Sequence, residues 1–104
     1  MTPRRHRDRK PTHPGELLRE VVLPSLNRPK AEIARLLDIS RESLYRILDE
    51  RQPVTPPMAV KLGKLCGNGP HLWLQMQANY DLWQAQRDVD VTGIPTLEPA
   101  AEPT

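Results

Sequence analysis

Apolar residues recur along the middle of the chain at the three- and four-residue spacing of a helix, and prolines or glycines separate the recurring segments. This pattern predicts five helices. We expect them over residues 14–23, 30–37, 41–48, 56–66 and 70–87, with Pro24 ending the first. Alternation of apolar and polar residues is long enough to suggest a strand only at residues 89–92. The sequence therefore predicts an all-α fold.

The first helix opens with a capping sequence. Thr12 or His13 is expected to cap it, and Pro14 suits its first turn, where a backbone N–H is not needed. The inner face of this helix is predicted to consist of Leu17, Leu18, Val21 and Val22. Ser40 is expected to cap the third helix through its hydroxyl group.

The fifth helix carries two apolar stripes, whereas a surface helix of a monomer needs one. One stripe consists of Trp73, Met76, Tyr80 and Trp83, and the other of Leu74, Ala78, Leu82 and Ala85. Either the chain buries this helix on both sides, or one stripe packs on its own core and the other on a second copy. We favour the second alternative and predict a homodimer, with the aromatic stripe as the candidate interface. The spacing alone leaves open which stripe faces the partner.

The second and third helices have the lengths and the short turn of a helix-turn-helix. Ala34 is a small residue where the two helices cross, and Ile39, Leu44 and Ile47 are apolar where the third helix packs back. The outward positions of the third helix are Arg41, Glu42, Tyr45 and Arg46, with Ser40 and Ser43 at its start. Arginine can bind guanine through two N–H groups, hydroxyl groups reach phosphates, and glutamate accepts from cytosine. A solvated helix face carries the same residue types, so the helix-turn-helix spacing is what favours DNA.

Charge divides the chain into three parts. Residues 1–10 contain five lysines and arginines and one acid, whereas residues 88–104 contain four acids and no base. Both ends also contain prolines and few apolar residues, which is typical of segments that do not pack. We therefore expect a flexible basic arm at 1–11, a helical domain at 12–87 and an acidic tail at 88–104. The arm is either a solvated tail or a minor-groove contact through Arg4, Arg5, Arg7 and Arg9.

The composition argues against several other classes of protein. Cys66 is the single cysteine, so an internal disulfide cannot form, and a reducing cytoplasm is the expected location. The apolar runs are too short to span a membrane, and the basic N-terminus lacks the apolar stretch of a signal peptide. The histidines and Cys66 show no metal-ligand spacing, and the chain has no phosphate-binding loop or nucleophile motif. We expect no enzyme activity, no metal and no cofactor.

Several motifs resemble the HigA- and VapI-type antitoxins, which are small members of the Cro/lambda-repressor-like helix-turn-helix superfamily. The most specific are the opening His13-Pro14-Gly15-Glu16 and the closing Tyr80-Asp81-Leu82-Trp83, and the segments 32–41, 47–48, 54–56 and 72–75 add to them. The resemblance spans about residues 12–87. It implies a homodimer that binds an inverted-repeat operator in its own promoter. It also implies a cognate HigB/RelE-like toxin, a ribosome-dependent mRNA endonuclease that the antitoxin neutralises by binding.

The resemblance further implies which residues contact DNA. Base contacts are expected from the outward residues of the third helix, and backbone contacts from Lys30, Arg51 and Gln52. Two positions depart from the family pattern. Pro29 replaces the usual Ser or Thr before the second helix, which removes a phosphate contact. Asp38 replaces the usual glycine in the turn, so it must adopt a left-handed conformation and places a negative charge near DNA.

Two other functions fit the same residues. One is a free-standing repressor of this fold without a toxin partner. The other is a protein-interaction adaptor whose helix-turn-helix no longer reads DNA, which the acidic Asp38 and Glu42 favour. If a toxin is the partner, we expect it on the outward face of the first helix, at Glu16, Arg19 and Glu20, with the acidic tail as an auxiliary contact.

Overall fold

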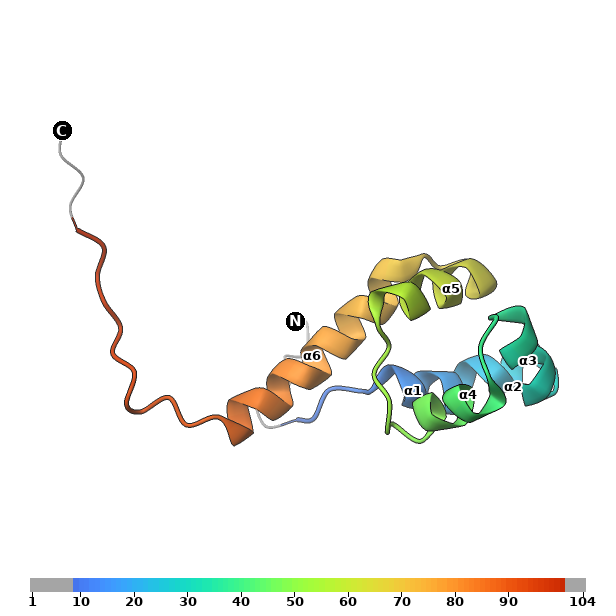
Figure 1. The fold of residues 1–104 in the computed structure, drawn as a ribbon, viewed down its shortest axis with the longest axis horizontal. Coiled ribbons are helices and arrows are strands. Elements are labelled where there is room, and N and C mark those ends of the chain that lie inside the picture. Colours follow the sequence, from blue (N-terminus) through green and yellow to red (C-terminus); the bar gives the residue numbers. More distant parts are fainter. Residues whose placement is uncertain (1–8, 101–104) are drawn as a thin grey trace, which may run out of the picture.

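A computed structural model describes residues 9–100, and the regular structure in that range consists of helices alone (Figure 1). The elements are α1 (Pro14–Leu17), η1 (Leu18–Val22), α2 (Leu23–Leu26), α3 (Lys30–Leu36), α4 (Arg41–Leu48), α5 (Pro56–Cys66) and α6 (Pro70–Asp88). The first three follow one another without a break and form one helix, so the predicted all-α fold with five helices is confirmed. The strand suggested at residues 89–92 is wrong. There, the Asp90 carboxylate accepts hydrogen bonds from the backbone N–H and the hydroxyl group of Thr92.

The expectation that Pro24 ends the first helix is also wrong. η1 is a π-helical turn, in which the N–H of Leu23 donates to the carbonyl of Leu18, five residues earlier. A proline in an α-helix clashes with the carbonyl four residues before it, and the wider turn relieves this clash. The helix therefore continues to Leu26 and ends at Asn27, whose φ is 51°. Val21 is 57% exposed, so its predicted place on the inner face of this helix is wrong.

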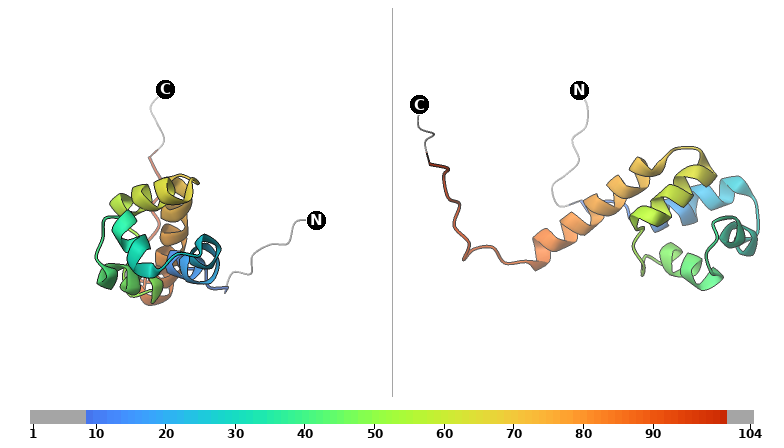
Figure 2. Two further views of the ribbon diagram at one scale, coloured as in Figure 1. Left: turned by 90° about the vertical axis from the view of Figure 1, so that its right-hand side faces the viewer. Right: turned by 45° about the horizontal axis from the view of Figure 1, so that its top comes forward.

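The core lies between the first helix, α3, α4 and α5, and α6 packs along α5 and against α1 (Figure 2). Trp73 of α6 is fully buried in this core, and its indole N–H donates to Oδ1 of Asn68 at 3.0 Å. α5 and the start of α6 approach closely because Gly63 has no Cβ atom, which would overlap the backbone of Gly69. The result is a fixed body on which α3 and α4 are exposed along one side.

The aromatic stripe of α6 faces its own chain. Trp73 is completely buried, so its assignment to a dimer interface is wrong. The Tyr80 ring packs edge-on against His13, with ring centroids 4.8 Å apart. Lys10 Nζ lies 5.1 Å from the Tyr80 ring centroid and 5.9 Å from that of Trp83. The N-terminal segment thus packs on this stripe, and the remaining candidates (Met76, Tyr80 and Trp83) are only half-exposed.

The packed part of the chain begins before residue 12. Pro11 is buried and Lys10 lies over two rings of α6, so the last residues of the expected flexible arm belong to the domain. The rest of that arm, including Arg4, Arg5 and Arg7, lies outside the described residues, as do residues 101–104. The end of α6 projects beyond the other helices, and residues 89–100 continue from it as exposed chain (Figure 1). Within residues 9–100, none of the helices has the length and hydropathy needed to cross a membrane.

Candidate nucleic-acid interface

The turn between α3 and α4 is closed by backbone hydrogen bonds that need a left-handed residue. The N–H of Asp38 donates to the carbonyl of Arg35 at 3.1 Å, and that of Ile39 to the carbonyl of Ala34 at 3.0 Å. This is the Schellman pattern that ends many helices. Asp38 supplies the left-handed residue with a φ of 56°, as the sequence predicts. Ala34 is buried, which allows α4 to cross α3 closely.

α4 presents one face to the core and the opposite face to solvent. Ser40 caps it as predicted, because its Oγ accepts from the N–H of Ser43 at 3.0 Å. The inner face is formed by Leu44, Ile47 and Leu48, all buried. The outward residues are Arg41, Glu42, Tyr45 and Arg46, which are exposed, while Ser43 is half-buried. The structure therefore places the candidate base-contacting residues on one surface, and their contacts with DNA stay a prediction.

The first helix holds the far end of α4 in place. His13 caps α1 by accepting the N–H of Gly15 on Nδ1 at 2.9 Å, which decides between His13 and Thr12. Gly15 then lies against the Ile47 carbonyl, so closely that a Cβ atom would overlap it. The guanidinium group of Arg19 donates to the carbonyl of Leu48 at 2.6 Å. Sequence reasoning missed the role of Gly15 and Arg19 in positioning α4, although the His-Pro-Gly-Glu motif contains the first of them.

Two contacts organise the exposed face of α4. Arg46 and Glu42 form an ion pair of 2.7 Å between neighbouring turns. Lys30, at the start of α3, places its Nζ 5.7 Å from the ring centroid of Tyr45. One candidate backbone contact and one candidate base contact are therefore next to each other, while the guanidinium group of Arg46 already has a carboxylate partner.

Arg51 and Gln52 lie at the opposite end of α4 from Ser40, about 12 Å along a helix of this length. A further left-handed residue, Glu50 with a φ of 62°, ends α4 and turns the chain toward them. The N–H groups of both Arg51 and Gln52 donate to the carbonyl of Arg46, at 2.8 and 3.3 Å. Arg51 is exposed and Gln52 half-buried. The structure thus does not bring these two candidates together with the residues at the start of α4.

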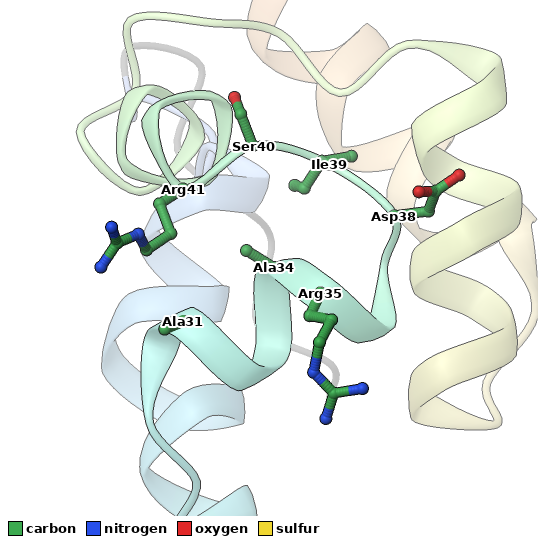
Figure 3. Close-up of a pocket in the computed structure, with 7 residues that line it drawn as sticks. All are labelled: Ala31, Ala34, Arg35, Asp38, Ile39, Ser40 and Arg41. Carbon is green, nitrogen blue, oxygen red and sulfur yellow. The ribbon is translucent and has the colours of Figure 1, made fainter.

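An open hollow of about 540 Å³ lies between α3 and the start of α4 (Figure 3). It is lined by Ala31, Ala34, Arg35, Asp38, Ile39, Ser40 and Arg41. Figure 3 shows the guanidinium groups of Arg35 and Arg41 projecting outward from its two sides. Arg35 is absent from the contacts that the sequence predicts, although its position on α3 beside the turn could have indicated it.

Burial lowers the pKa of His13 from its usual value of 6.5, and the positive charges of Lys10 and Arg19 also lower it. The nearby carboxylates of Glu50 and Asp81 oppose this effect without cancelling it. A lowered pKa favours the neutral imidazole, which leaves Nδ1 free to accept the Gly15 N–H. Among residues 9–100, no group of three or more His, Cys, Asp or Glu side chains could hold a metal ion.

No family model matches this chain. It is 36% identical over 80 residues to an uncharacterized HTH-type transcriptional regulator of Haemophilus influenzae. The aligned region covers 77% of this chain and 75% of that protein. It is 34% identical over 76 residues to virulence-associated protein I of Dichelobacter nodosus, covering 73% of this chain and 70% of that protein.

The fold is also similar to a solved structure that contains DNA. That structure holds the Pseudomonas aeruginosa antitoxin HigA with the higBA promoter. The two chains superpose with a TM-score of 0.76 at 28% identity, over 88% of this chain and 100% of the other. The likeness therefore includes α6 as well as the two helices of the helix-turn-helix.

Proposed function

Because this chain belongs to the HigA- and VapI-type family of helix-turn-helix antitoxins, we propose that it binds an operator as a homodimer and neutralises a cognate toxin. In this proposal the protein acts by binding rather than by catalysis. Autorepression follows if the operator lies in its own promoter. The proposal also places the protein in the cytoplasm, where both the operator and a ribosome-dependent toxin are found.

The exposed face of α4 is the observation that carries the DNA-binding part of the proposal. Its residue types are those that bind base edges and phosphates in the major groove. The Schellman turn at Asp38 fixes one end of α4, and Gly15 and Arg19 fix the other. A recognition helix held at both ends keeps its side chains in a constant register on the base pairs, which sequence-specific binding requires.

The outward stripe of α6 is the proposed dimer interface, in place of the aromatic stripe. Leu82 is 58% exposed there, and Val89 continues the stripe beyond the end of α6 with the same exposure. Ala85, Val89 and Val91 line a shallow hollow of about 370 Å³. Neighbouring exposed apolar groups are typical of a surface that a partner covers. A two-fold dimer would place its recognition helices one DNA turn apart, roughly 34 Å.

The first helix is the proposed toxin-binding surface. Glu16 and Glu20 are exposed on it, together with Val21. Arg19 also contacts Glu20 and the end of α4, so it is not a free cation on this face. Acidic groups around an apolar side chain complement the basic surface that an RNA-cleaving toxin needs for its own substrate. The acidic tail, with Asp88, Asp90 and Glu98, is an auxiliary contact in this proposal.

Co-expression with the neighbouring small gene tests the antitoxin part of the proposal. We expect the two proteins to purify together, and we expect this protein to restore the growth of cells that express the toxin. The double variant Glu16→Lys/Glu20→Lys reverses both charges on the first helix and should weaken this association. Glu98→Lys makes the same kind of charge reversal in the tail, for comparison. A protein that binds DNA but rescues no toxin would be a free-standing repressor. One that binds neither would support the adaptor function.

A further inference from the structure

The hollow between α3 and α4 brings together two arginines from different helices. Arg35 comes from the last turn of α3, and Arg41 is the first residue of α4. The side chains of Ala31 and Ala34 lie between them and are too small to fill the hollow, which stays open to solvent (Figure 3). A group that enters this hollow from solvent would meet a guanidinium group on each side.

Both arginines are exposed and free of carboxylate partners within the described part of the chain. Three other arginines there, Arg19, Arg28 and Arg46, each form an ion pair of 3.5 Å or less. Arg35 and Arg41 form no ion pair of up to 4 Å with an acid between residues 9 and 100. An anion can therefore bind them without displacing a carboxylate, whereas Arg46 must first give up Glu42.

The acid that lines the hollow does not face it. Figure 3 shows the carboxylate of Asp38 projecting from the turn toward α5. Asp38 also lines a separate groove with Val60, Lys61 and Lys64 of α5, and its carbonyl oxygen accepts from Lys61 Nζ at 3.2 Å. The Asp38 carboxylate is thus directed away from the hollow. The mouth of the hollow keeps a positive character.

We propose that Arg35 is a further DNA-contacting residue, which together with Arg41 holds a phosphate group of the DNA backbone in this hollow. Arg41 then contacts the backbone rather than a base. The inference rests on the proposed DNA-binding function. With the outer face of α4 in the major groove, the phosphates border the groove beside α4. Arg35 lies on the neighbouring helix at that border rather than on the face that meets the bases. A guanidinium group donates two parallel hydrogen bonds to a phosphate, and each such contact releases condensed counterions.

The salt dependence of binding to a duplex of random sequence tests this assignment. Arg35→Ala should reduce the slope of log K against log salt by about one unit. Between 50 and 200 mM salt, the fold-loss of affinity for Arg35→Ala is then about threefold smaller than that for the wild type. Lys64→Ala is the matched control, because it removes the same charge from an exposed position on α5 outside the hollow. Arg35→Lys keeps the charge but loses the planar guanidinium group. The slope for this variant should lie between those for Arg35→Ala and the wild type.

Three results are informative besides the expected one. If the salt slopes of Arg35→Ala and Lys64→Ala are equal, the assignment of Arg35 is wrong, while DNA binding by the wild type still stands. If Arg35→Ala weakens only the operator and changes its base preference, Arg35 reads a base and the phosphate assignment is wrong. If the wild type binds neither duplex at low salt, the proposed function itself fails. An unchanged melting temperature of Arg35→Ala shows that the variant is folded, as its exposed side chain predicts.

Discussion

The carbonyl oxygen of Ile47 occupies the space that a Cβ atom on residue 15 would need, so only Gly15 lets the first helix lie against α4. The contact sits beside a second one, in which Arg19 donates to the carbonyl of Leu48. The last carbonyl groups of a helix have no partner within it. Here the Leu48 carbonyl accepts from Arg19 of the first helix, and the Ile47 carbonyl accepts from the N–H of Glu50. The orientation of the recognition helix therefore depends on residues that never face DNA.

Gly15→Ala is expected to destabilise the fold by about 1–3 kcal/mol, because the methyl group forces α1 away from α4. Urea unfolding measures the change. Gly93→Ala is the control, since a Cβ atom at residue 93 meets no atom within 4 Å. Equal stability of the two variants would contradict the close approach of the two helices. The folded fraction of Gly15→Ala should also bind DNA more weakly, because α4 has lost its support.

Asp38→Gly is expected to stabilise the protein by about 1 kcal/mol, since a left-handed backbone is costly for a residue with a Cβ atom and free for glycine. Thermal unfolding measures this. Asp49→Gly is the contrast, because Asp49 has an ordinary φ of −84°, and glycine there only adds flexibility to the unfolded chain. A destabilised Asp38→Gly variant would show that the Asp38 side chain contributes more than its conformation costs.

Acidification should weaken the fold through His13. Its pKa is lowered in the folded state, mainly by burial, so below pH 6.5 the unfolded chain takes up the proton first. Stability is therefore fully present above pH 6.5 and declines as the pH falls toward the folded-state pKa. Protonation also removes the Nδ1 acceptor for Gly15. His13→Asn keeps a capping oxygen without titrating in this range, and its stability should decline less. The same decline in both proteins would assign it to another group.

Leu82→Glu is expected to convert the dimer to a monomer, because it places a charge in the proposed interface on α6. Light scattering over a concentration series measures the change. Val60→Glu on α5 is the matched control, since Val60 is 59% exposed and Leu82 is 58% exposed. Dissociation by Val60→Glu alone would move the interface to α5. A wild-type protein that is monomeric at high micromolar concentration would contradict the dimer altogether.

The helix-turn-helix could be predicted from local signals. The cap at Ser40, the small Ala34 and the left-handed Asp38 all act within a few residues of their partners, and the structure has each of them as expected. The first helix could not be predicted in full. A proline normally stops an α-helix, and nothing near Pro24 reveals the wider turn that lets the helix continue.

Which stripe of α6 is covered by its own chain also could not be predicted, because this depends on tertiary contacts. The aromatic stripe looks unpartnered as long as residues 1–11 are taken for a flexible arm and His13 for a helix cap alone. Lys10 and His13 contact Tyr80 from a segment about 70 residues away in the chain, and helical spacing carries no information about such a contact. The positioning of α4 by Arg19 is long-range in the same sense, because Arg19 and Leu48 belong to different helices.

The ratio of affinities for operator and non-operator DNA tests the central claim most directly. The wild-type protein is titrated into a duplex from upstream of its own gene and into a scrambled duplex of the same length and composition, at one physiological salt concentration. A sequence-specific repressor should bind the first duplex at least about 10³-fold more tightly. Equal affinities for the two duplexes would contradict operator recognition by α4.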